Sequence, residues 1–103
     1  MRDTHFDVLI VGSGAAGLSL ALQLPETLSI GLLSKSDLNS GSTSWAQGGM
    51  AAVLHERDTI ESHVADTLQA GAGLCHEDAV TFTVEQSRSV VDWLVAQLSL
   101  IHI

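Results

Sequence analysis

Short apolar runs separated by a glycine-rich turn dominate the first third of the chain. Residues 6–11 form a continuous, β-branched-rich run, which favours a strand buried on both faces of a parallel sheet. Residues 15–23 have helix-forming composition, and Pro25 follows where that helix should end. Residues 28–33 predict a second strand. The order strand, glycine turn, helix, strand predicts a βαβ unit.

The regular pattern fails between residues 34 and 58. Residues 36–49 are rich in Ser, Gly, Thr and Asn, and residues 50–54 predict either a short strand or a helical turn. A structureless stretch of this length is uncommon in a compact domain and is usually functional where it occurs. We therefore expect part of the candidate site here.

Helical periodicity returns near Thr59 and continues toward the end of the chain. Asp58 and Glu61 have the spacing of a capping box, and Gly71 and Gly73 should end the first helix. A second helix should begin at residues 76–78, where acidic residues suit the helix dipole. Its apolar stripe consists of Val80, Val84, Val91, Leu94 and Val95.

These elements predict an α/β fold with a Rossmann-like βαβ unit followed by helices. Two strands do not complete a doubly wound sheet, so we expect residues 1–97 to be the N-terminal part of a larger, truncated domain. Residues 98–103 match the translation of a transposon end sequence used in sequencing libraries. We predict that they form a non-native tail and that the native reading frame ends at about Gln97.

Charge and cysteine content narrow the range of partners. Four Lys and Arg stand against twelve Asp and Glu, a formal net charge of −8, which argues against nucleic-acid partners and anionic membrane surfaces. No apolar run approaches the ~20 residues of a membrane span. Cys75 is alone, so an internal disulfide is excluded and a cytoplasmic location is expected.

The turn between the first strand and helix matches the G-x-G-x-x-G pattern of dinucleotide-binding proteins. Its residues are Gly12, Ser13, Gly14, Ala15, Ala16 and Gly17. The first glycine permits a tight turn, the second lets a pyrophosphate approach the backbone, and the third lets helix and sheet pack closely. The helix N-terminus then offers free N–H groups to the phosphates.

The end of the second strand bears on the choice between NAD and FAD. An acid at this place usually reads the adenosine ribose, but the chain has Ser34, with Asp37 three residues later. A serine hydroxyl can still bond a ribose hydroxyl, and Lys35 could reach a phosphate or the adenine rim. The missing acid argues against NAD, although this motif alone does not exclude it.

A second candidate segment combines small hydroxyl residues, an aromatic ring, an amide and a glycine pair. Such a stretch can wrap a large planar ligand, because its glycines let the backbone pass against a ring. Its residues are Ser42, Thr43, Ser44, Trp45, Ala46, Gln47, Gly48 and Gly49.

Together these motifs resemble the fumarate reductase and succinate dehydrogenase flavoprotein family. The resemblance rests on the glycine motif, on Leu-Leu-Ser-Lys at residues 32–35, and on residues 41–53, and it covers nearly all of residues 6–97. It continues through residues 58–66, 67–75 and 90–94. Within that family the chain is most similar to the members that oxidise L-aspartate.

The resemblance implies roles for several residues. Residues 13–16 would contact the pyrophosphate of FAD, Lys35 would lie on the FAD, and residues 42–49 would line the flavin and its ribityl chain. Covalent members attach the flavin through a histidine, and Ser42 stands at that place here. The resemblance therefore implies non-covalent FAD.

The implied reaction is hydride removal from L-aspartate to flavin, giving iminoaspartate. Oxygen or fumarate would reoxidise the flavin, and quinolinate synthase would use the product on the way to NAD. The family's catalytic Arg, His and Glu residues match no position of this chain, so no catalytic residue is assigned. Three alternatives stay open: a succinate or fumarate flavoprotein, an NAD-dependent dehydrogenase, and an inert truncated fragment.

Overall fold

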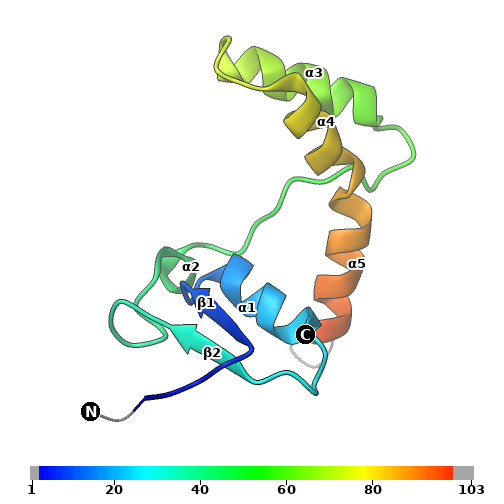
Figure 1. Cartoon of the computed structure of the whole chain (residues 1–103). Helices are drawn as coiled ribbons and strands as arrows, with labels where there is room; N and C mark the ends of the chain where they lie inside the picture. The colour runs from blue at the N-terminus through cyan, green and yellow to red at the C-terminus, as the bar shows by residue number, and fades with distance from the viewer. Residues whose placement is uncertain (1–2, 99–103) are drawn as a thin grey trace. The chain divides into compact units, whose positions relative to one another are not determined.

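The computed structural model describes residues 3–98, except for the side chain of Leu98. Residues 99–103, which make up most of the predicted non-native tail, lie outside the described part. The chain divides into two compact units, Met1–Gly48 and Gly49–Ile103. Figure 1 shows the helices and strands of each unit, which we describe separately.

The first unit is built around a parallel pair of strands. In chain order it contains β1 (Val8–Val11), α1 (Ala15–Gln23), β2 (Ile30–Leu33) and the short helix α2 (Ser42–Trp45). Strands β1 and β2 pair in parallel, with Val8 opposite Ile30 and Val11 opposite Leu33. This arrangement confirms the predicted α/β class and βαβ unit, including both ends of the first helix.

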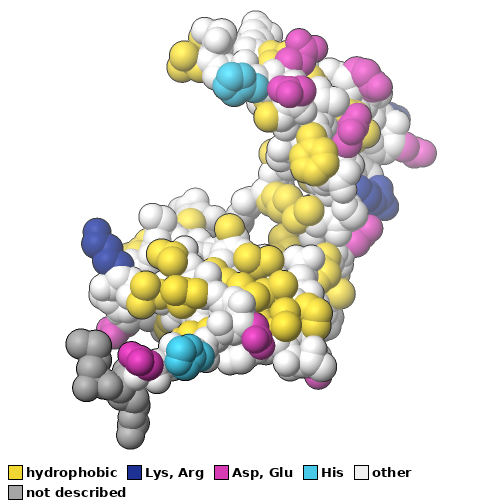
Figure 2. Space-filling view, viewed as in Figure 1, with side chains coloured by type: hydrophobic (Ala, Val, Ile, Leu, Met, Phe, Trp, Pro, Cys, Tyr) yellow, Lys and Arg dark blue, Asp and Glu magenta, His cyan; other side chains and the backbone are white. Residues whose placement is uncertain are grey.

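Within the described residues of this unit, α1 covers one face of the sheet, and the Phe6 ring covers part of the other face at Gly31. Ile10 is buried, and its Cγ2 atom would lie 3.3 Å from a Cβ placed on Gly17 of α1, so α1 packs on the Ile10 face. Side chains alternate between faces along a strand, and on the opposite face Leu9 and Val11 are 58% and 76% exposed. The expected burial on both faces is thus not met, because one helix covers one face of two strands. Figure 2 shows hydrophobic side chains gathered on this unit.

Both strands are shorter at their beginnings than the apolar runs predict. The Asp7 carboxylate accepts the Ser29 N–H at 2.7 Å, which joins the two chain segments just before the ladder starts. The Phe6 ring occupies the space beside Gly31, where a Cβ would lie 2.7 Å from the ring. Phe6 therefore packs over the start of the sheet instead of extending β1.

The second unit contains three helices: α3 (Ile60–Gly71), α4 (Glu77–Glu85) and α5 (Ser87–Leu98). Its buried hydrophobic residues are Val64 of α3 and Val84 of α4. Acidic side chains are spread over α3 and α4 in Figure 2. Within residues 3–98, no helix is both long and apolar enough to cross a membrane.

The ends of α3 differ in detail from the sequence prediction. Thr59, not Asp58, is the N-cap: its hydroxyl accepts the Ser62 N–H at 3.0 Å, while Asp58 accepts the Thr59 N–H at 2.8 Å. The helix ends at Gly71 as predicted, but the next residue, Ala72, takes the left-handed conformation with φ of 50°. Gly73 follows with φ of 89°, so two successive residues with positive φ reverse the chain.

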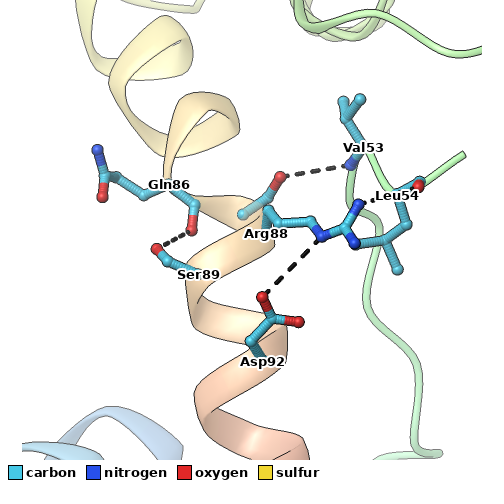
Figure 3. A network of polar contacts seen from close by, with 7 residues as sticks. Val53, Leu54, Gln86, Arg88, Ser89 and Asp92 are labelled. Carbon is cyan, nitrogen blue, oxygen red and sulfur yellow. Dashed lines mark hydrogen bonds and ion pairs between the residues drawn. The ribbon is translucent and has the colours of Figure 1, made fainter. Parts of the chain in front are cut away.

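The second predicted helix is in fact two helices, α4 and α5, separated at Gln86. Ser87 is 6% exposed, and its hydroxyl accepts the Val53 N–H at 3.3 Å. Arg88 donates to the Leu54 carbonyl at 3.2 Å, as Figure 3 shows. Residues 50–54 form neither of the predicted elements, and side chains of α5 bond two of their backbone groups, the Val53 N–H and the Leu54 carbonyl.

Candidate cofactor site

The glycine turn connects β1 to α1 and leaves very little space for side chains. Gly12 donates its N–H to the Leu33 carbonyl at 2.8 Å and has φ of +118°, a conformation that L side chains rarely adopt. A Cβ on Gly17 would lie 2.0 Å from the Gly12 carbonyl oxygen. Hence the first glycine is required by conformation and the third by close packing, as the motif predicts.

The N-terminus of α1 has neither a capping side chain of its own nor an acidic residue that would compete with an anion. Its N-cap is Gly14, which has no side chain, and its first turn contains no acidic residue. The first bond of the helical ladder runs from the Leu18 N–H to the Gly14 carbonyl at 3.0 Å. The preceding amides of the first turn have no partner within the helix and add to its positive end. This arrangement suits a phosphate group.

Two serine hydroxyls link the glycine turn to the end of β2. The Oγ atoms of Ser13 and Ser34 lie 3.1 Å apart, and the Ser13 hydroxyl donates to the Leu38 carbonyl at 3.1 Å. The Ser34 hydroxyl donates to the Asp37 carbonyl at 3.3 Å. Ser34 thus stands beside the glycine turn where an acid usually reads a ribose, while Lys35 is exposed.

The second candidate segment begins as the helix α2 instead of an irregular loop. Its Thr43 hydroxyl accepts the Ala15 N–H at 3.1 Å, which brings the segment against the start of α1. Trp45 is 84% exposed, and Ala46, Gln47 and Gly48 are exposed too. Their contact with a cofactor stays a prediction, as does that of Ser42, Ser44 and Gly49.

Gly49 is the first residue of the second unit. The first unit thus brings together the turn at residues 12–17, Ser34 and Thr43. The family resemblance implies a place for Thr43 along the flavin and does not predict its bond to Ala15. No periodicity or motif in the sequence signals a contact between residues 28 positions apart.

Comparison with known proteins adds an independent line of support. Residues 7–102 match the family described as "FAD binding domain". L-aspartate oxidase of Pseudomonas aeruginosa is 68% identical over 91 residues, which are 88% of this chain and 17% of the relative. The enzymes of that name from Yersinia pestis and Vibrio cholerae are 59% and 53% identical over 91 and 94 residues. These make up 88% and 91% of this chain but 17% and 18% of the relatives, so it spans less than a fifth of their length.

Proposed function

Because the chain belongs to the FAD-binding-domain family, we propose that it is the N-terminal, cofactor-binding part of an FAD-dependent L-aspartate oxidase. The observation that carries the proposal is the turn at Gly12–Gly17, whose backbone is free of side chains where a diphosphate would approach. The 68% identity to the Pseudomonas aeruginosa enzyme supports the choice of substrate.

The residues present fit the diphosphate of FAD. The first-turn amides of α1 would hold it, in a region where Gly14 has no Cβ and no acid opposes it. Ser34 would bond the adenosine ribose through a hydroxyl, and Lys35 would offer a positive charge. FAD, when bound, supplies the capacity to accept a hydride, while the protein supplies orientation and electrostatics.

The expected reaction converts L-aspartate to iminoaspartate. We expect oxygen or fumarate to reoxidise the flavin and quinolinate synthase to use the product. Ser42 stands where covalent relatives have a histidine, which supports non-covalent FAD. The cytoplasmic location expected from the lone Cys75 stays a prediction.

A chimeric protein tests this proposal directly. In it, the 91-residue segment of the Pseudomonas aeruginosa enzyme that matches this chain is replaced by the corresponding residues of this chain, without the predicted non-native tail. We expect the chimeric protein to purify yellow, to release its flavin on acid precipitation, and to keep the aspartate oxidation of its parent, because that activity needs a loaded cofactor site. A colourless protein would overturn the proposed cofactor site and favour the NAD-dependent alternative. The succinate dehydrogenase alternative is tested separately, by assaying the product of the full-length gene with aspartate and with succinate. Flavin that stays in the acid pellet would contradict non-covalent binding.

A further inference from the structure

We infer that Thr43 is a positioning residue of the diphosphate end of the site, and not part of the flavin lining. This inference rests on the proposed function. It starts from the bond between the Thr43 hydroxyl and the Ala15 N–H, 3.1 Å long, which joins α2 to the first residue of α1. The same oxygen would lie 3.2 Å from a Cβ placed on Gly14.

Thr43 supplies from a distance the cap that α1 lacks. Helices usually begin with a Ser, Thr, Asp or Asn side chain that accepts one of the free first-turn amides. Gly14 cannot do this, and the accepting oxygen comes instead from Thr43, which lies 28 positions after Ala15. The cap therefore forms only when α2 lies against the glycine turn, so the bond orders two parts of the site at once.

The chemistry of a hydroxyl lets this cap remain when a diphosphate is bound. A threonine Oγ has one proton to donate and two lone pairs to accept with. After accepting the Ala15 N–H, Thr43 still has its proton, whereas a phosphate oxygen can only accept. Thr43 can hold Ala15 and face an anion without competing for the same donor. The other first-turn amides, those of Ala16 and Gly17, remain for the diphosphate.

The test measures two ligands on the chimeric protein stripped of cofactor. ADP carries the diphosphate and adenosine but no flavin, so it separates the two ends of the site. We expect Thr43→Val to weaken both FAD and ADP about tenfold, while Thr43→Ser stays within about twofold of the parent. Absorbance of the bound flavin should not change, because the inference places Thr43 at the diphosphate end of the site. Thr83→Val is the matched control, because the exposed Thr83 hydroxyl bonds only to Ala79 of its own helix.

Several results would overturn the inference. Unchanged ADP affinity with a shifted flavin spectrum in Thr43→Val would place Thr43 at the flavin. If Thr43→Ser bound FAD and ADP as weakly as Thr43→Val, loss of the hydroxyl could not be the cause of the weaker binding. If Thr43→Val does not fold, Thr43→Ala makes the same measurement without added bulk. A parent protein that binds neither ligand would overturn the proposed function itself, whereas a parent that binds both with Thr43→Val unaffected would overturn only this inference.

Discussion

Helices α1 and α3 begin in opposite ways. Helix α3 is capped by its own Thr59, whose hydroxyl accepts the Ser62 N–H, and it carries Glu61 in its first turn. Helix α1 begins at a glycine, has no acid in its first turn, and receives its cap from α2. The start of α3 is thus satisfied by its own first residues, whereas α1 depends on a distant hydroxyl for one amide and leaves the others without a partner in the helix, as the proposed diphosphate site requires.

The largest effect should come from adding a single carbon to Gly17. In Gly17→Ala the new Cβ would meet the Gly12 carbonyl oxygen at 2.0 Å, and a backbone atom cannot move aside. We expect a loss of about 3 kcal/mol in the free energy of unfolding of the chimeric protein, with no FAD retained on purification. Gly41→Ala is the control, because nothing lies within 4 Å of its Cβ position. Full FAD retention in Gly17→Ala would show that α1 does not pack as described.

A smaller effect should follow from giving α1 the acidic first turn that α3 has. Ala16→Asp puts a negative charge beside the free amides, which favours the helix itself but repels a diphosphate. We expect FAD affinity to fall about 100-fold while the melting temperature of the cofactor-free protein stays equal or rises slightly. Ala16→Asn, which is nearly the same size and uncharged, should lose much less affinity. Equal losses of FAD affinity in the two variants would mean that the size of the side chain, and not its charge, lowers the affinity.

The smallest effect is expected at the cap of α3. Thr59→Ala removes the acceptor of the Ser62 N–H and should lower the free energy of unfolding by about 1 kcal/mol, as measured by denaturant titration. Thr59→Ser should restore it. FAD affinity should not change in either variant, since this cap belongs to the second unit. A tenfold loss of FAD affinity would contradict the division of roles between the two helices.

Local patterns in the sequence predicted local structure well. The bounds of α1 are the predicted ones, and the parallel pair follows from two apolar runs separated by a glycine turn and a helix. The cap of α3 was misplaced by one residue, since Asp58 and Thr59 are both suitable residues and only geometry decides between them.

Contacts between distant residues escaped prediction for a physical reason. The separation of α4 from α5 coincides with the partly buried hydrogen bond between Ser87 and Val53, which lie 34 positions apart. Neither a proline nor a glycine marks the separation at Gln86. In the site, the glycine turn was predicted because its geometry depends on adjacent residues. The Thr43 bond was not, because it depends on how residues 34–41 return the chain to α1.

The residue types at the glycine turn determine whether cofactor binding takes up or releases protons. Gly12–Gly17, Ser34 and Thr43 carry only backbone amides, methyl groups and hydroxyls, and none of these gains or loses a proton between pH 5 and 8. Uptake of a dinucleotide through these contacts should therefore exchange no protons with the solvent. The heat of cofactor binding measured by calorimetry should be the same in buffers of different ionisation enthalpy. Cofactor binding through these contacts should therefore not depend on pH between 5 and 8.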